Sequence, residues 1–481
     1  MPVPYVSTRD GRKPPERLNF EDVVLKGLAE DGGLFVPDAW PRLDAASLAA
    51  LRGKSYAEIA AAVTAPFLEG AFTADEWWDL VAEAYRGFDH RAVAPLKQLG
   101  PELWLMELFH GPTLAFKDYA LQLLGLLFDR MLNRRGERVT IVGATSGDTG
   151  SAAIAACRDR ERLDIFILYP EGRISEVQRR QMTTVPSANV HAVAIAGNFD
   201  DCQDLVKALF ADRSFRAALN LSAVNSINWA RIVGQVVYYV AAAVALGAPD
   251  RPIAFAVPTG NFGNVYAAHV ARRMGVPIAQ LVIGTNRNDI LARFINEGRM
   301  TIGAVEPSLS PSMDIQVSSN FERLYFELAG HDGALVGDAF RAFRASGTLP
   351  ATPALWDETR ALFSAYRIDD EGTTRSIAET YRATGELLDP HSAIGLAAAQ
   401  AARRDKAVPM VALACAHPAK FPDAVESATG VRPSLPARLA DLMTRPERLA
   451  VLPNQISAVQ RFIRERARAG ARAVSHEDAT P

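Results

Sequence analysis

The chain has 481 residues, of which 49% are hydrophobic and 22% charged, and its formal net charge is −3. This length exceeds that of one ordinary domain, and the composition is typical of a globular protein with a large core. A charge so close to zero gives no general attraction to nucleic acid or to an anionic membrane, so we expect neither as a partner.

Targeting and metal signals are weak in this sequence. The first 20 residues contain no hydrophobic signal core, and no apolar run reaches the roughly 20 residues that span a bilayer. Cys157, Cys202 and Cys415 lie far apart and form no CxxC pair. This spacing argues against a disulfide framework or a metal site, and it suits a reducing compartment. We therefore expect a cytoplasmic protein without a bound metal.

Residues 1–95 are predicted to form a small, mainly helical domain. The stretches at 47–63 and 74–88 carry apolar residues at helical spacing. They are separated from the start of the chain by the loop-forming run DGGLFVPDAWP at 31–41.

From residue 96 onward, short apolar strands alternate with helices. This pattern is typical of parallel sheets covered on both faces, which bind ligands at the carboxyl ends of their strands. We expect an α/β protein with two parallel-sheet domains, interleaved over 96–430, and a C-terminal helical segment with a mobile tail at 431–481. The predicted strands are 138–144, 164–170, 189–197, 253–258, 277–285 and 409–416, and the predicted helices include 148–160, 199–212, 227–247 and 288–298.

Lys117 lies in the segment ELFHGPTLAFKDYALQLLG (107–125), in a chain where only eight of 52 basic residues are lysine. A lysine near a helix start can reach solvent along its own stem. Here the flanking helix is apolar on most faces, which predicts burial. Burial costs several kcal/mol unless the pKa of the amine falls or chemistry consumes it. A neutral amine attacks aldehydes, which arginine cannot do.

Two strand-to-helix turns are rich in small residues, VPTGNFGN (257–264) and GATSGDTG (143–150). Small residues let backbone N–H groups approach an anion, and the helix N-terminus adds partial positive charge. Neither turn has the Walker A or GxGxxG spacing of nucleotide sites. The alternatives are an ordinary turn for the first and a simple helix cap by Asp148 or Thr149 for the second.

Arg231 belongs to a third candidate site, the segment NSINWARIVGQ (225–235). Asn225, Ser226 and Asn228 precede a long helix, and Arg231 lies on its first turn. The forked guanidinium is well suited to a phosphate. The alternative is a capped helix with a surface arginine.

Cys415 follows a predicted buried strand in ALACAHPAKFPDAV (412–425), together with His417 and Lys420. A thiol nucleophile is disfavoured because no third group orients the pair and no helix start activates the thiol. A small polar residue that faces a ring nitrogen fits this strand end better.

A lysine for an aldehyde, a glycine loop for a phosphate and a polar residue for a ring nitrogen are the attachment points of pyridoxal phosphate. The chain resembles the threonine synthase family, in its longer branch of fungi and many bacteria, within the pyridoxal-phosphate enzymes of the tryptophan-synthase β-subunit fold (fold type II). The resemblance covers nearly the whole chain. Beyond the segments above, it rests on YVSTRDG (5–11), EDGGLFVP (30–37), GRISEVQRRQMTT (172–184), MDIQVSSNFERL (313–324), DPHSAIG (389–395) and AHPAKF (416–421).

The resemblance implies a role for each candidate residue. Lys117 would bind the cofactor covalently, and Cys415 would lie beside the pyridine nitrogen, where the longer branch usually has threonine. Ser226 and Arg231 would hold a phosphate of the substrate. The cofactor phosphate would be cradled by Gly260, Asn261, Phe262, Gly263 and Asn264, and the substrate-binding loop would comprise Thr145, Ser146, Gly147, Asp148 and Thr149.

The implied activity is the conversion of O-phospho-L-homoserine and water to L-threonine and phosphate, by γ-elimination and β-addition of water. This carbon–oxygen lyase reaction ends threonine biosynthesis. The alternatives are a sister enzyme, such as a threonine or serine dehydratase or a cysteine-synthase-like enzyme, and a catalytically silent binding protein. The sister substrates do not require a second phosphate site with Arg231. The sequence leaves the oligomeric state open between monomer and dimer.

Overall fold

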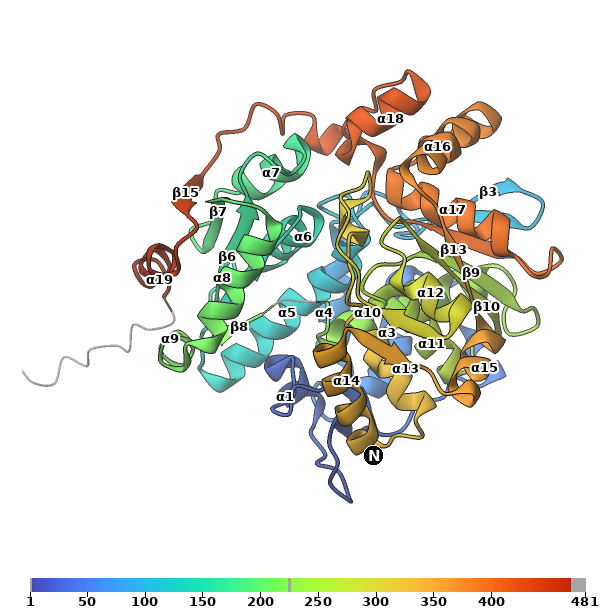
Figure 1. Ribbon diagram of the computed structural model, residues 1–481, viewed down its shortest axis with the longest axis horizontal. Coiled ribbons are helices and arrows are strands. Elements are labelled where there is room, and N and C mark those ends of the chain that lie inside the picture. Colours follow the sequence, from blue (N-terminus) through green and yellow to red (C-terminus); the bar gives the residue numbers. More distant parts are fainter. Residues whose placement is uncertain (1, 224–225, 469–481) are drawn as a thin grey trace, which may run out of the picture. The chain divides into compact units, whose positions relative to one another are not determined.

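The computed structural model describes residues 2–223 and 226–468 (Figure 1). The chain divides into two compact units: unit 1 is Met1–Leu124 with Ser226–Ala437, and unit 2 is Gly125–Asn225 with Arg438–Pro481. Asn225 and the predicted mobile tail beyond residue 468 lie outside the described residues. The three-part division at residues 95 and 430 stays a prediction, and each unit is described by itself below.

Unit 1 is built on a sheet that has six strands in its described part, in the order β13-β10-β9-β14-β4-β3. All neighbours are parallel except β3, which runs antiparallel to β4. Every residue of β9 and β14 is buried, which explains their unbroken apolar sequences. The strands are β3 (Leu96–Gly100), β4 (Leu103–Glu107), β9 (Ile253–Pro258), β10 (Ile278–Thr285), β13 (Phe363–Arg367) and β14 (Met410–Ala414).

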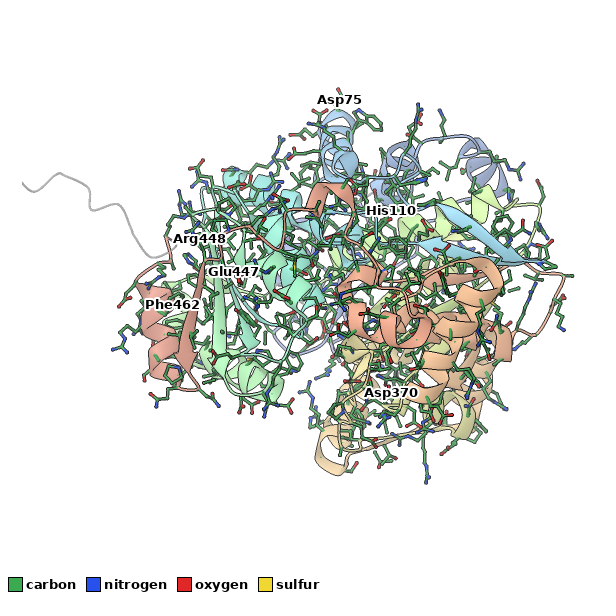
Figure 2. All side chains as sticks on the ribbon, turned by 90° about the horizontal axis from the view of Figure 1, so that it is seen from above. Asp75, His110, Asp370, Glu447, Arg448 and Phe462 are labelled. Atoms are coloured by element: carbon green, nitrogen blue, oxygen red, sulfur yellow. The ribbon has the colours of Figure 1, made fainter. Side chains whose placement is uncertain are left out.

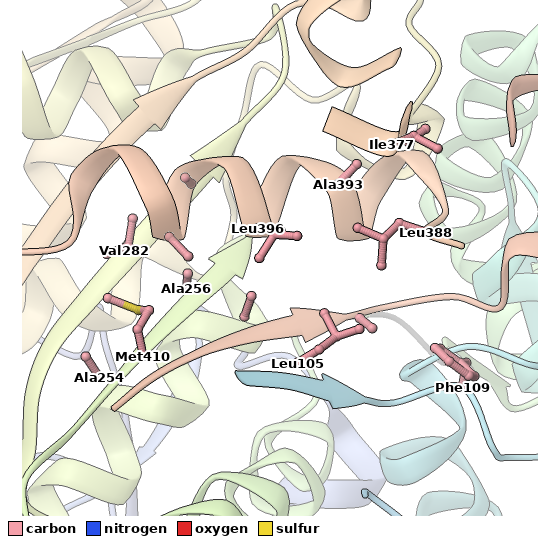
Figure 3. Close-up of a cluster of buried hydrophobic side chains, with 14 residues drawn as sticks. Leu105, Phe109, Ala254, Ala256, Val282, Ile377, Leu388, Ala393, Leu396 and Met410 are labelled. Atoms are coloured by element: carbon pink, nitrogen blue, oxygen red, sulfur yellow. The ribbon is translucent and has the colours of Figure 1, made fainter. Parts of the chain in front are cut away.

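Helices cover both faces of this sheet. On one face α17 (Pro390–Ala402) crosses the strands and packs on an apolar cluster that includes Ala254 and Ala256 of β9 (Figure 3). Side chains alternate between the faces of a strand, so Phe255 points to the other face. There its ring lies 4.8 Å from that of Tyr239 in α10 (Trp229–Ala245). The helix predicted over 227–247 therefore backs the sheet.

The remaining elements of unit 1 surround this sheet (Figure 1). The first part of the chain is mainly helical, as predicted, with one small antiparallel strand pair, β1 and β2. The elements are β1 (Tyr5–Ser7), α1 (Phe20–Lys26), β2 (Phe35–Pro37), α2 (Ala45–Ala50), α3 (Tyr56–Thr64), α4 (Ala74–Arg86), α11 (Gly263–Met274), α12 (Ile290–Glu297), β11 (Arg299–Thr301), α13 (Phe321–Leu328), α14 (Gly333–Ser346), β12 (Thr348–Pro350), α15 (Pro353–Leu362), α16 (Asp370–Thr384) and α18 (Pro422–Thr429).

Unit 2 contains a second parallel sheet, with the described order β15-β7-β6-β5-β8. Its three central strands were predicted at 138–144, 164–170 and 189–197, and the structure confirms them. The strands are β5 (Val139–Ala144), β6 (Leu163–Pro170), β7 (Val190–Ala196), β8 (Leu221–Ser222) and β15 (Leu449–Pro453), and the helices are α6 (Asp148–Cys157), α7 (Glu176–Thr183), α8 (Phe199–Ala211), α9 (Arg213–Ala218) and α19 (Ile456–Arg464). The helix α5 (Lys117–Arg135) contains the boundary between the units at Leu124.

The C-terminal segment of unit 2 adds the edge strand β15, which the sequence analysis did not predict. Arg448, just before the strand, donates its backbone N–H to Thr183 O at 2.6 Å, and Glu447 accepts from Thr183 Oγ1 at 2.6 Å. Glu447, Arg448 and Phe462 all lie in this C-terminal segment (Figure 2). The ring of Phe462 packs edge-on against that of His191. None of the helices within residues 2–223 and 226–468 combines the length and the hydrophobicity that are needed to span a bilayer.

Candidate active site

Three of the predicted site segments follow neighbouring parallel strands of unit 1. Lys117 comes after β4, Cys415 directly after β14, and the glycine loop (260–264) after β9. These strands are adjacent, since Met410 of β14 is in register with both Leu103 and Ala254. Because the carboxyl ends of parallel strands share one edge, the structure brings these three segments together there.

The loop before Lys117 is hydrogen-bonded to the end of β14. Phe116 N donates to Cys415 O at 2.8 Å, and His417 N donates to Leu114 O at 3.0 Å. Lys117, the first residue of α5, therefore directly follows Phe116, whose main chain is bonded to that of Cys415. The lysine is only 7% exposed, and its Nζ lies 4.8 Å from the centre of the Phe116 ring. The predicted burial of Lys117 is confirmed.

Asp118 and Lys420 hold the turn that presents Lys117. The Asp118 carboxylate accepts from Thr113 N at 2.8 Å and from Thr113 Oγ1 at 2.7 Å. Burial raises the pKa of Asp118 above its ordinary value, and the hydrogen bonds from Thr113 oppose this shift. Lys420 is fully buried and donates from Nζ to Thr113 O at 2.8 Å. The AHPAKF segment therefore fixes the lysine turn as well as the strand end.

The glycine loop leads into a helix whose first turn has no side-chain cap. Phe262, at the cap position of α11, adopts a left-handed conformation with φ of 62°. The first backbone N–H groups of a helix have no intrahelical acceptor, so an uncapped start suits an anion. A Cβ on Gly260 would lie 3.1 Å from Met313 Cα. The loop is thus closely packed from behind, and its shape and donors fit a phosphate group.

Asn264 ties this helix start to α10. Its Oδ1 accepts hydrogen bonds from the hydroxyls of Tyr238 and Tyr239, the latter at 2.8 Å. Its Nδ2 is buried and has no hydrogen-bond partner within the described part of the chain. An amide N–H₂ of this kind is a donor that a bound oxyanion would satisfy.

The segment 318–320 supports the glycine loop from a distant part of the sequence. Ser318 Oγ donates to Gly260 O at 2.8 Å, and Ser319 N donates to Asn261 Oδ1 at 2.9 Å. Asn320 Nδ2 donates to Asn261 O at 3.1 Å. The sequence analysis gave these residues no role, because only their place in MDIQVSSNFERL marked them.

Cys415 is anchored by a buried network that the sequence analysis also missed. Its backbone N–H donates to Ser392 Oγ at 2.8 Å, and Ser392 Oγ in turn donates to Asp389. Asp389 also lies 2.7 Å from Nδ1 of His391. His391 Nε2 is 3.3 Å from Ser312 N, and an amide can only donate, so the ring proton lies on Nδ1 facing Asp389. The available signal was the helix-capping pattern Asp-Pro in DPHSAIG.

Arg231 is buried, so the surface alternative is wrong. It is 4% exposed, and its Nε and Nη1 atoms are buried without a hydrogen-bond partner among the described residues. Burial lowers the pKa of Arg231 to about 10, which leaves the guanidinium charged at neutral pH. A buried cation without an acceptor is costly, and a bound anion would remove that cost.

Ser226 connects the Arg231 segment to the glycine loop, because Asn261 Nδ2 donates to Ser226 Oγ. Asn228, between Ser226 and the helix, caps α10 by accepting from Ala230 N at 3.0 Å. The candidate substrate-phosphate segment therefore lies against the candidate cofactor-phosphate loop.

The loop 145–149 lies in unit 2, at the carboxyl end of β5. Thr145 Oγ1 accepts from Gly147 N at 3.0 Å and from Gly150 N at 2.8 Å. Asp148 begins α6 and accepts from Gln178 Nε2 at 2.9 Å, while Gly147 occupies the cap position without a side-chain bond. The capping alternative for Asp148 and Thr149 is therefore wrong, and the substrate-binding role of the loop stays a prediction.

The fold and the strand-edge lysine define a pyridoxal-phosphate-dependent enzyme. The family model described as "Pyridoxal-phosphate dependent enzyme" matches residues 89–349, more than half of the chain. On either side, the models "Threonine synthase N terminus" and "Threonine synthase, C-terminal" match residues 4–85 and 392–463. Within the described residues, no three His, Cys, Asp or Glu side chains are grouped to hold a metal ion.

Relatives and solved structures narrow the class. A threonine synthase of Pseudomonas aeruginosa is 56% identical over 467 residues, which cover 97% of this chain and 99% of the relative. The crystal structure of a PLP-bound threonine synthase from Brucella melitensis matches with a TM-score of 0.94 and 52% identity, covering 97% of this chain and all of that chain. The yeast threonine synthase structure matches with a TM-score of 0.91 and 38% identity, covering 96% and 98%. The chain belongs to the threonine synthase family.

The packing of Gly150 gives a test of the unit 2 loop. A Cβ at this position would lie 2.5 Å from Thr145 Cγ2 and 2.8 Å from Ile167 Cγ2. Gly150→Ala should therefore push Thr145 away from its two amide donors and lower the free energy of unfolding by about 1–3 kcal/mol. Gly100→Ala is the control, because nothing lies within 4 Å of that Cβ position. Urea unfolding measures both, and equal effects would contradict the proposed contact.

Proposed function

We propose that this chain converts O-phospho-L-homoserine and water to L-threonine and phosphate. The observation that carries the proposal is Arg231, whose buried Nε and Nη1 have no hydrogen-bond partner among the described residues, near a glycine loop that begins a helix without a side-chain cap. Each of these two places is a candidate anion site. Both the cofactor and this substrate carry a phosphate, so the reaction needs two such sites. Membership of the threonine synthase family supports the same reaction.

The residues of unit 1 fit pyridoxal phosphate. Lys117 would hold its aldehyde, the loop from Gly260 to Asn264 its phosphate, and Cys415 its pyridine nitrogen. When bound, the cofactor supplies an electron sink for negative charge at the substrate Cα. These assignments agree with the buried amine, the uncapped start of α11 and the strand end at Cys415.

The chain's own side chains would bind the substrate and move its protons. The Lys117 amine would take the proton from Cα and return one later, because a desolvated amine serves both as base and, once protonated, as acid. Ser226 and Arg231 would hold the phosphate on Cγ until it leaves. The loop of Thr145, Ser146, Gly147, Asp148 and Thr149 would bind the substrate through its hydroxyls and amides.

A dehydratase of threonine or serine is the alternative, and the second anion site disfavours it. Its substrates carry no phosphate, so the buried donors of Arg231 would stay unsatisfied throughout turnover. Phosphate release from O-phospho-L-homoserine, compared with 2-oxo acid formation from threonine and serine, separates the two activities. The proposal includes a cytoplasmic location and a small-molecule substrate. It also includes an oligomeric state of monomer or dimer, and light scattering would distinguish these two states.

Lys117 gives the first test of this function. Lys117→Ala should abolish the visible absorption of lysine-bound cofactor and lower turnover by at least about 10³-fold, because both the covalent attachment and the acid–base group are lost. Lys117→Arg is the matched variant, since it keeps a cation of similar length that cannot attack an aldehyde. Absorption spectra and phosphate release measure the outcome. If either variant retained turnover, the assignment of Lys117 as the catalytic, cofactor-binding lysine would be wrong.

Arg231 predicts a trade-off between binding and stability. Arg231→Met should raise KM for the phosphorylated substrate by roughly 10- to 100-fold, since a charge-assisted hydrogen bond is lost, and should leave cofactor affinity nearly unchanged. The same change removes a buried cation, so the substrate-free enzyme should unfold at an equal or higher urea concentration. Lower stability with an unchanged KM would show that Arg231 serves the fold instead.

Cys415→Thr tests the strand-end position. A threonine hydroxyl can hydrogen-bond a ring nitrogen at least as well as a thiol, so turnover should stay within about tenfold of the parent. Cys415→Ala removes the polar group and should be slower than Cys415→Thr. Phosphate-release rates compare the three proteins, and complete inactivation by threonine would argue against this placement.

A further inference from the structure

Arg323 lies in the first turn of α13 and is completely buried. Within the described part of the chain its guanidinium donates to two distant segments and to the cap residue of its own helix. Nε donates to Phe35 O of β2 at 3.0 Å, and Nη2 donates to Ile227 O at 2.5 Å. Nη1 donates to Asn320 Oδ1. Residues 35 and 227 thus meet the start of α13 at one side chain, although they lie far from it in the sequence.

The charge of Arg323 is not needed for a local ion pair. Its three acceptors named above are neutral oxygens. The adjacent Glu322 is instead held by Arg9, through Nε at 2.8 Å and Nη2 at 2.6 Å, and by Thr8. Burial lowers the pKa of Arg323 to about 10, which shows the cost of keeping this cation in the core. The forked guanidinium can donate to all three acceptors at once, which a smaller neutral side chain could not do.

Asn320 transmits the effect of Arg323 to both candidate anion sites. A guanidinium has donors only, so the Asn320 oxygen must face Arg323 and its N–H₂ group must face the other way. Nδ2 then donates to Asn261 O at 3.1 Å and to Ser226 O at 3.2 Å. Asn261 belongs to the glycine loop, and Ser226 belongs to the segment that leads to Arg231.

We propose that Arg323 is a positioning residue that holds the two phosphate-binding segments, 226–231 and 260–264, in a fixed relation to each other. It acts directly on the first segment through Ile227 and on both through Asn320. Neither segment then has to be ordered when its anion arrives, so both phosphates bind at a lower entropic cost. This inference rests on the proposed function, which assigns the two segments to the substrate and the cofactor.

A purely structural arginine would behave differently. It would join β2 to α13, and its loss would lower stability without a selective effect on ligands. The positioning role predicts that one substitution, at a residue with no contact to either phosphate, weakens both binding events together. Arg231 offers the contrast, because its loss should affect the substrate alone.

The test is Arg323→Lys, measured on the holoenzyme. Lysine keeps the charge, but its single ammonium cannot meet three acceptors spread around a planar fork. We expect KM for O-phospho-L-homoserine, the inhibition constant of inorganic phosphate and the dissociation constant of the cofactor each to rise about tenfold, which corresponds to about one lost hydrogen bond. Phosphate-release kinetics give the first two, and loss of cofactor absorbance on dilution gives the third.

Arg404→Lys is the matched control. Arg404 also donates to main-chain carbonyls in unit 1, those of Arg360, Ala361 and Phe363, but at the amino end of β13, the opposite end of the sheet from the site. It should leave all three constants unchanged. If Arg323→Lys fails to fold, Asn320→Ala breaks the same link and should give the same joint loss.

The outcomes separate this inference from the function on which it rests. An increase of all three constants in Arg323→Lys, with none in Arg404→Lys, supports the positioning role. Unchanged constants, or a change for only one of the two ligands, overturn it, while a raised KM in Arg231→Met would leave the proposed function standing. An unchanged KM in Arg231→Met would instead overturn the substrate-phosphate site itself.

Discussion

The main-chain pairing between residues 114–116 and 415–417 is the constraint on which the site depends. Phe116 N to Cys415 O and His417 N to Leu114 O join the end of β14 to the turn before α5. Without these bonds, a lysine ten residues beyond β4 would be held near the sheet mainly by the contacts of Asp118 and Lys420 with Thr113. With them, Lys117, the proposed covalent attachment point, lies beside the strand end, and β9 on the other side of β14 is followed by the glycine loop.

The burial of the sheet explains why the environments of Arg231 and Arg323 bear on their roles. β9 and β14 are buried along their whole length, and so is most of α10, so water is excluded from the site's surroundings. In such a medium an uncompensated charge is costly and a paired one is strongly held. Among residues 2–223 and 226–468, two buried nitrogens of Arg231 have no acceptor, while Arg323 donates to neutral oxygens. The first arrangement fits the proposed binding of an anion, and the second fits the proposed positioning of the backbone around it.

The sequence predicted the strands β5, β6, β7, β9, β10 and β14, whose residues are mostly apolar and mostly buried. It did not predict β4, a central strand of unit 1 that is only partly buried. The edge strands β3 and β15 have mixed or alternating exposure over five residues, so they carry no such signal. Lys117 could be found because a rare residue type stands in an apolar helix. Thr145 could be placed at a strand end, but its hydrogen bonds to Gly147 and Gly150 depend on a backbone turn that no propensity specifies.

The supporting residues of the site escaped prediction for a different reason. Asn320 and Arg323 act through oxygens of residues 35, 226, 227 and 261, and contacts over such sequence distances leave no periodic pattern. Their residue types are equally suited to a helix cap or an exposed helix face. Only the fold shows that an arginine is buried there and that an amide faces two loops.

The contacts of α13 also indicate a structural role for residues 5–37 at the start of the chain. Thr8 and Arg9 hold Glu322, and Phe35 O accepts from the next residue, Arg323, so the β1–β2 pair clamps the start of α13 from one side. The same helix start presents Asn320 to the glycine loop from the other side. The side chains of Arg323 and Asn320 therefore link Phe35 of β2 to Asn261 of the glycine loop. The residues at the N-terminal strands hold Glu322 and Arg323 at the start of α13, and Asn320 at the same helix start donates to the glycine loop. The N-terminal strands therefore form part of the scaffold that supports the proposed anion-binding loops.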